Sequence, residues 1–278
     1  MLNSIFGKRK EKSNSESVPS SVIQNYFEFD ADYYARVSDN TAMDTTSHSF
    51  STSFWPPIRC GQFVQGKNAV VLKSLEFVVD DQELNGFIKG SDVFRNFSAL
   101  GIDQTIVKAG SKENSIHLVV DTNICPSENS YDLQVGNNQV IVVGAERQGL
   151  LYGLYTLLQT FKLFSEQGKD TSGQLSLTLP ALVISDRPDV SQRAVLWSYR
   201  QQVRTSTARM QEQIELLSRL RMNTLFLTVD EPTATETESQ ALSEFLRLGH
   251  ASLIDVIPTV LVTSIHQGYV RALYICNF

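Results

Sequence analysis

The stretch AERQGLLYGLYTLLQTFKLF, residues 145–164, decides how the centre of this chain folds. Its apolar residues recur with the spacing of one broad helix face. Gly149 and Gly153 stand four residues apart in the same stretch, and a glycine inside a helix costs roughly 1 kcal/mol relative to alanine. We therefore predict a helix over 145–164 that lies across a sheet, with the two glycines at the closest contact. The apolar face consists of Leu150, Leu151, Leu154, Leu157, Leu158 and Phe161.

Short segments rich in β-branched and aromatic residues lie on both sides of this helix in the sequence. Gly136-Asn137-Asn138 separates two of them and predicts a hairpin turn, because Gly and Asn tolerate positive φ. A short helix is expected over 91–100, ended by Gly101. This arrangement predicts an α+β domain, an antiparallel or mixed sheet with helices on one face. The expected strands are 70–72, 75–79, 104–107, 116–120, 131–135 and 139–143, followed by extended chain over 175–184.

The pattern changes after Arg187-Pro188. Apolar strands are expected at 194–197, 223–229 and 253–262, and amphipathic helices lie between them at 206–222 and 240–248. Alternation of strand and helix predicts parallel βαβ units. The chain therefore has two parts with different architectures.

The composition excludes several classes of protein. The 278 residues carry a formal net charge of −6, and 42% of them are hydrophobic. A general nucleic-acid binder is excluded because phosphate contacts need clustered Lys and Arg. No apolar stretch is long enough to span a membrane. Cys60, Cys125 and Cys276 have neither disulfide nor zinc spacing, and no phosphate-binding glycine loop is present, so we expect no metal and no cofactor. The absence of a signal peptide favours a cytoplasmic location.

Seven short motifs, in this order, resemble family 20 of the glycoside hydrolases, the β-N-acetylhexosaminidases. Three belong to the family's non-catalytic α+β domain, one to the linker that follows it, and three to the first strands of its barrel. They are YDL at 131–133, GAERQGLLYG at 144–153, TLLQ at 156–159, ISDRP at 184–188, RAVLWSYR at 193–200, RMNTLF at 221–226 and VIP at 256–258. Related α+β domains precede the barrels of α-glucuronidases and α-N-acetylglucosaminidases, which remain alternatives.

The Ser-rich composition of the N-terminal region and the resemblance of the rest together predict three regions. Residues 1–65 are expected to be largely disordered, 66–186 to form the hexosaminidase-like α+β domain, and 187–278 to form the first β/α units of a truncated TIM-like barrel. The implied substrate is a glycan with a terminal N-acetylhexosamine, whose own acetamide acts as the nucleophile while an Asp positions it and a Glu is the general acid. In the family that pair lies in a His-x-Gly-Gly-Asp-Glu motif.

The printed sequence contains no such motif, so no catalytic residue is assigned. The sequence after Arg193 is also shorter than the roughly 200 residues or more of a complete barrel. We therefore expect an inactive or truncated form. A second chain is a candidate partner that would complete the barrel. The alternative from another class is a non-catalytic glycan-binding or interaction protein.

Two residues are candidates for substrate binding by resemblance. Arg200 corresponds to the family's arginine that holds sugar hydroxyls, although the spacing from Arg193 is one residue short and Ser198 stands where an Asp is usual. Asp230 follows a strand at the edge where barrels place their chemistry. The alternatives are a surface or salt-bridged arginine and a helix-capping carboxylate. Arg193 itself is predicted to be structural.

Overall fold

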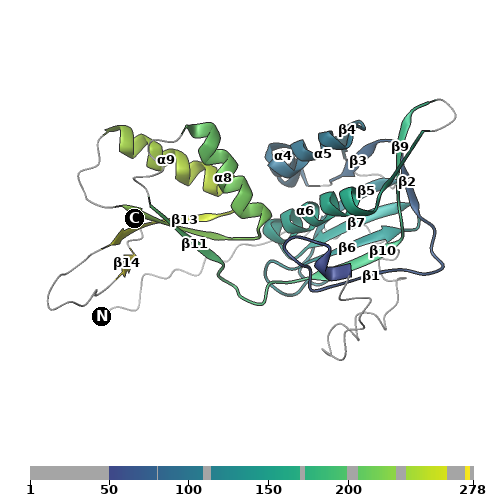
Figure 1. The fold of residues 1–278 in the computed structure, drawn as a ribbon, viewed down its shortest axis with the longest axis horizontal. Coiled ribbons are helices and arrows are strands. Elements are labelled where there is room, and N and C mark those ends of the chain that lie inside the picture. The colour runs from purple at the N-terminus through teal and green to yellow at the C-terminus, as the bar shows by residue number, and fades with distance from the viewer. Residues whose placement is uncertain are drawn as a thin grey trace. The chain divides into compact units, whose positions relative to one another are not determined.

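The computed structural model describes residues 50–79, 81–108, 114–169, 173–198, 206–229, 236–261 and 273–275. The described strands form sheets of seven, four and three strands (Figure 1). All of them belong to one compact unit, Ala42–Phe278. Their buried apolar side chains form two hydrophobic clusters, one in the α+β part of the chain and one in the βαβ part.

The seven-stranded sheet is mixed, as predicted for an α+β domain. The first four strands in spatial order pair antiparallel. From the fourth strand onward all pairs are parallel. The spatial order is β1 (Cys60–Phe63), β10 (Leu182–Asp186), β6 (Tyr131–Gly136), β7 (Gln139–Gly144), β5 (Ser115–Val120), β3 (Leu75–Val78) and β4 (Gln104–Val107).

A two-residue turn joins β6 to β7 at the centre of this sheet. Asn137 and Asn138 have φ values of 50° and 61°, and Gly136 pairs with Gln139. Positive φ at both central residues is what a tight hairpin with the natural strand twist requires. The predicted hairpin is therefore confirmed.

Helix α6 (Arg147–Phe164) lies against β6 and β7 (Figure 1). The close packing explains why its sequence contains two glycines. A Cβ atom at Gly149 would lie 2.2 Å from the carbonyl oxygen of Ser130. One at Gly153 would lie 2.6 Å from the side chain of Val142. These distances are far shorter than van der Waals contact, so only glycine lets the helix approach the sheet this closely.

Two shorter helices lie on the same side of the sheet as α6 (Figure 1). The first, α4 (Gln82–Gly90), was not predicted from the sequence. Its N-cap is Asp81, whose Oδ1 accepts from the N–H of Leu84 at 2.7 Å. The second, α5 (Asp92–Phe97), continues into the 3-10 helix η1 (Ser98–Leu100) and ends at Gly101, which has a φ of 76°. The predicted helix over 91–100 is thus confirmed.

The three-stranded sheet is antiparallel and contains β2 (Val70–Leu72), β9 (Leu175–Leu179) and β8 (Glu166–Lys169). Strand β8 was not predicted, and all four of its residues are exposed. Residues 50–65 belong to the N-terminal region that is expected to be largely disordered, but in the structure they contribute β1 and three buried apolar side chains, Phe50, Phe54 and Ile58. Residues 1–49 lie outside the described part of the chain.

The C-terminal part forms the predicted parallel βαβ units. Strands β11 (Ala194–Ser198), β12 (Thr224–Val229) and β13 (Asp255–Leu261) pair parallel in this order. Helices α8 (Thr207–Arg219) and α9 (Glu236–Ala251) connect them, and the hydroxyl of Ser206 caps α8. Strand β14 (Leu273–Ile275) pairs antiparallel with β13. The described strands form an open sheet, so the predicted incomplete barrel stays a prediction.

Candidate functional site

The carboxyl ends of β11, β12 and β13 lie at one edge of the four-stranded sheet. The register pairs Ser198 with Thr228 and Thr228 with Thr259. Val195 and Trp197 of β11 pack against the core that includes residues of α8 and α9. Side chains alternate along a strand, so Ser198, Thr228 and Thr259 lie on the opposite face. In a barrel that face would line the interior.

These three hydroxyl side chains bring no acid or base to the edge. The hydroxyl of Thr228 donates to the carbonyl of Trp197 at 3.2 Å, and that of Thr259 donates to the carbonyl of Ile257 at 3.1 Å. Thr259 is buried. Within the described residues, the two threonines of this row therefore donate to carbonyl groups of the sheet itself.

The two substrate-binding candidates, Arg200 and Asp230, lie outside the described residues. Ser198, two residues before Arg200, ends β11, and Val229, one residue before Asp230, ends β12. Because β11 and β12 are parallel and in register, both chain segments leave the sheet from the same edge. The roles of the two side chains stay predictions.

Arg193 lies at the opposite end of β11 and contacts neutral acceptors. Its Nε donates to the carbonyl of Arg221 at 2.6 Å, and its Nη1 donates to the carbonyl of Val190 at 2.7 Å. Its Nη2 donates to the hydroxyl of Tyr152 at 3.2 Å. Its own N–H donates to Oδ1 of Asn223 at 2.8 Å. These bonds join the beginnings of β11 and β12 to α6, consistent with the predicted structural role.

A buried ion pair between Asp186 and Arg221 joins the same regions. The hydroxyl of Tyr131 donates to Asp186 at 3.0 Å, and the backbone N–H of Arg59 donates to it at 2.9 Å. Arg221 also donates to the hydroxyl of Thr156 at 3.2 Å and lies 5.7 Å from the centre of the Tyr131 ring. Burial raises the pKa of the Asp186 carboxyl, and the charge of Arg221 opposes that rise.

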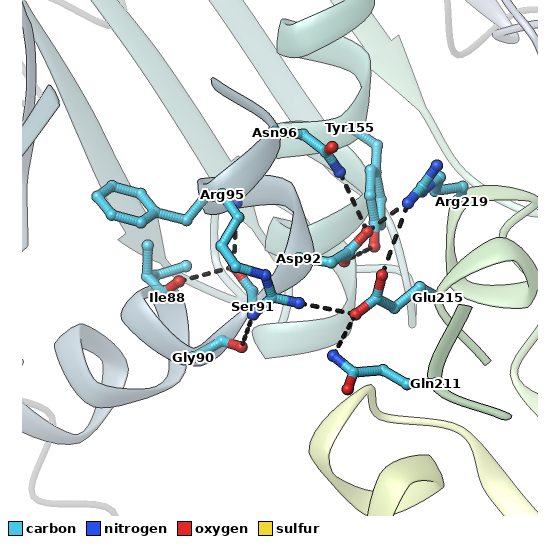
Figure 2. A network of polar contacts seen from close by, with 11 residues as sticks. Ile88, Gly90, Ser91, Asp92, Arg95, Asn96, Tyr155, Gln211, Glu215 and Arg219 are labelled. Carbon is cyan, nitrogen blue, oxygen red and sulfur yellow. Dashed lines mark hydrogen bonds and ion pairs between the residues drawn. The ribbon is translucent and has the colours of Figure 1, made fainter. Parts of the chain in front are cut away.

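A second polar cluster connects α5 and α6 to α8 (Figure 2). Arg219 donates to Asp92 at 3.2 Å, and the hydroxyl of Tyr155 donates to the other carboxylate oxygen of Asp92. Glu215 accepts from Arg95 at 2.7 Å. Arg219 also lies 3.7 Å from Glu215 and so links the two carboxylates.

This cluster is a structural contact and not an acid–base pair. Two carboxylates, Asp92 and Glu215, face two guanidinium groups, Arg95 and Arg219, so their charges balance. Burial and the charge of Asp92 raise the pKa of the Tyr155 hydroxyl, which therefore stays a hydrogen-bond donor. A buried tyrosine whose pKa is raised in this way does not release its proton at neutral pH, so it cannot act as an acid or a base there.

The histidine in the seven-stranded sheet has ordinary surroundings. His117 lies in β5, is buried, and its Nε2 lies 2.9 Å from the hydroxyl of Ser115. Within the described residues no three His, Cys, Asp or Glu side chains come together as a metal ion would require. No helix in the described ranges combines the length and apolar character needed to cross a membrane.

Sequence reasoning did not identify the polar groups that link the α+β part to the βαβ units. Asp186 stands in the ISDRP motif and Arg221 in the RMNTLF motif, but neither motif indicates that the two residues pair. Nothing in the sequence marks Asp92 or Tyr155 as special, since a polar residue after a helix cap and a tyrosine on an apolar face are both common. Their pairing depends on residues 63 positions apart in the chain.

The comparison with protein families gives one match. Residues 64–187 match the sequence model described as glycosyl hydrolase family 20, domain 2. No curated protein sequence matches the chain significantly.

Solved structures share the fold at low sequence identity. One is a glycoside hydrolase family 20 β-N-acetylglucosaminidase, with a TM-score of 0.53 and 16% identity over 73% of this chain and 41% of that one. The exo β-N-acetylglucosaminidase of Vibrio harveyi has a TM-score of 0.54 and 13% identity over 75% and 36%. The Streptomyces plicatus β-hexosaminidase has a TM-score of 0.54 and 16% identity over 74% and 45%.

This chain therefore spans less than half the length of each of these enzymes. The family match and the shared fold agree on the α+β part of the chain. Residues 64–187 are therefore similar to domain 2 of glycosyl hydrolase family 20, and the chain shares the fold of the corresponding part of these enzymes.

Proposed function

We propose that this chain belongs to a β-N-acetylhexosaminidase-like glycoside hydrolase and recognises a terminal N-acetylhexosamine. In this proposal residues 66–186 are the non-catalytic domain, and residues 187–278 are the first β/α units of the catalytic barrel. One observation carries it. A domain that matches family 20 continues directly into parallel strands β11, β12 and β13, with helices against one face only.

The proposed binding edge is the carboxyl end of these strands. Arg200 would donate hydrogen bonds to sugar hydroxyls, for which the fixed fork of a guanidinium group is suited. Asp230 would accept hydrogen bonds from the sugar. The register of β11 and β12 supports a common position, because Ser198 and Thr228 are paired just before the two segments begin.

Cleavage needs groups that the printed sequence does not supply. The resembled family uses the substrate acetamide as nucleophile and a protonated Glu as general acid, and this sequence has no Asp-Glu pair in the His-x-Gly-Gly context. A general acid must hold its proton near neutral pH and release it to the leaving oxygen. The 278 residues are therefore proposed to bind the sugar without hydrolysing it, and a second chain is the proposed source of any missing barrel units.

The test combines turnover and binding with the purified chain. We expect no release of nitrophenol from an aryl N-acetylglucosaminide above background, and binding of N-acetylglucosamine that is weakened at least about tenfold by Arg200→Ala. Arg209→Ala is the matched control, because Arg209 is an exposed arginine in α8. Turnover would refute the inactive state, and equal binding by both variants would refute the assignment of the sugar site.

The intact mass of the native protein tests separately whether the barrel is completed. A mass near 31.1 kDa together with a monomeric state in solution would refute a barrel completed by further chain or by a second subunit. A larger mass, or a stable complex with another chain, would agree with completion.

A further inference from the structure

A cavity of about 360 Å³ lies where the α+β part meets the beginnings of β11 and β12. Arg193, directly before β11, and Arg221, shortly before β12, both line it. This is the amino end of the parallel strands. It is therefore distinct from the carboxyl edge at which we propose hexosamine binding.

Four arginines line the cavity, and only two of them are paired with a carboxylate. Arg221 pairs with Asp186, and Arg59 pairs with Asp189. Arg193 and Arg187 form no ion pair with any described residue. The cavity therefore carries two positive charges that the surrounding side chains do not offset.

The two unpaired arginines differ in how much of their hydrogen-bonding capacity is used. Arg193 donates to two backbone carbonyls of its own loop, to the carbonyl of Arg221 and to the hydroxyl of Tyr152, all of which are neutral. Its Nη2 has a second hydrogen for which the described residues supply no acceptor. The guanidinium of Arg187 is exposed and makes no side-chain bond to a described residue. Both groups therefore have donors available for an anion.

A buried carbonyl oxygen at the cavity has no donor. Asn129 is 7% exposed and lines the cavity, and no described residue donates to its Oδ1. Its backbone N–H is occupied, because it donates to Glu146 at 2.6 Å. Buried polar atoms normally have a hydrogen-bond partner. Oδ1 has almost no accessible surface in this conformation, so the Asn129 amide would have to turn toward the cavity to accept from a hydroxyl group of a bound molecule.

We propose that this cavity binds a small phosphorylated sugar such as a hexose monophosphate. The dianionic phosphate would match the two unpaired charges of Arg187 and Arg193, and a sugar hydroxyl would donate to Asn129. The volume lies at the lower end of the roughly 300–1,000 Å³ typical of small-molecule sites, which suits a monosaccharide. A neutral sugar would leave both arginine charges unmatched, and a phosphate ion alone would leave most of the cavity empty.

The site joins two parts of the fold, because Asn129 precedes β6 and Arg193 precedes β11. A ligand held by both would bind the native state and not the unfolded chain. Binding should then raise the melting temperature of the whole chain.

The experiment uses glucose 6-phosphate as the probe, measured by calorimetry on the purified 278-residue chain. Inorganic phosphate and glucose are the comparison ligands. We expect glucose 6-phosphate to bind more tightly than phosphate, and glucose to give no heat. Arg187→Ala should weaken binding about tenfold, since it removes one charge-assisted contact. Arg209→Ala, which removes the same charge from exposed α8, should leave the affinity within about twofold.

Asn129→Asp is the second variant. It keeps the size of the side chain and adds a negative charge to the lining of the cavity that the phosphate dianion must enter, so binding should weaken. Should this variant fail to fold, Arg187→Ala still decides, because the Arg187 side chain has no bond to any residue that the structure describes. Absence of binding by the wild-type chain, equal affinities for phosphate and glucose 6-phosphate, or equal effects of Arg187→Ala and Arg209→Ala would each overturn the proposal.

The result is separable from the test of the hexosamine site. Arg200→Ala should bind glucose 6-phosphate as the wild type does, and N-acetylglucosamine should not compete with it. Competition between the two sugars would place them in one site and overturn the assignment of a second one.

Discussion

Replacement of Arg221 by methionine tests how the buried carboxylate of Asp186 is stabilised. The Asp186 side chain is 7% exposed and that of Arg221 13% exposed, so water cannot take over the role of the guanidinium. Methionine retains the long unbranched stem and adopts the positive φ of 59° at this position at a similar cost. The substitution therefore removes the charge and its hydrogen bonds with little other change.

The expected loss follows from what Asp186 retains. Removal of one partner of a buried ion pair costs about 3–5 kcal/mol, because the other charge stays buried without compensation. Asp186 would keep the hydrogen bonds from the Tyr131 hydroxyl and the Arg59 N–H. We therefore expect the lower end of that range, about 3 kcal/mol of unfolding free energy at neutral pH.

The pH dependence adds a second criterion. The pKa of Asp186 in the folded chain is raised by burial, so this group contributes stability that is complete below its unfolded pKa and is lost as the pH rises through its folded pKa. Without Arg221 the folded pKa rises further, because the opposing charge is gone. The difference in stability between wild type and Arg221→Met should therefore be largest at neutral pH and shrink towards about pH 4.

Urea unfolding followed by circular dichroism at several pH values measures both effects. Arg247→Met is the control, since Arg247 pairs with Glu244 on the exposed surface of α9 and should change stability little. Asp186→Asn combined with Arg221→Met should lose less than the sum of the single variants. A loss no larger than that of the control, or one that grows on acidification, would refute the reasoning.

Two further substitutions test the packing of α6. Gly149→Ala should destabilise the chain by more than about 2 kcal/mol, because its Cβ would lie 2.2 Å from the Ser130 carbonyl oxygen. Gly86→Ala in α4 has open space and should stabilise by up to about 1 kcal/mol. The melting temperatures of the two variants measure the difference. Equal melting temperatures would contradict the close contact between α6 and the sheet. Tyr155→Phe removes the donor to Asp92 and should cost about 1–3 kcal/mol; an unchanged melting temperature would show that this hydrogen bond is dispensable.

Local patterns in the sequence predicted most of the strands and helices. The helix over 145–164, the turn at Asn137-Asn138 and the parallel βαβ order were all visible, because each depends on residues close together in the chain. Helix α4 was missed since its stretch is polar and contains two glycines, and only the cap at Asp81 marks its start. Strand β8 was missed because its exposed residues show no alternation.

The sequence by itself determined the class of fold, the resemblance to family 20 and the need for glycine at two positions of α6. Periodicity and turn chemistry are local properties, and motifs can be read in order along the chain. Only the tertiary structure decided that Arg221 pairs with Asp186, that Tyr155 meets Asp92, and that Arg187, Arg193 and Asn129 line one cavity. Apart from Arg187 and Arg193, these residues lie tens of positions apart, and the folding that buries apolar surface brings them together, so no local pattern could specify them.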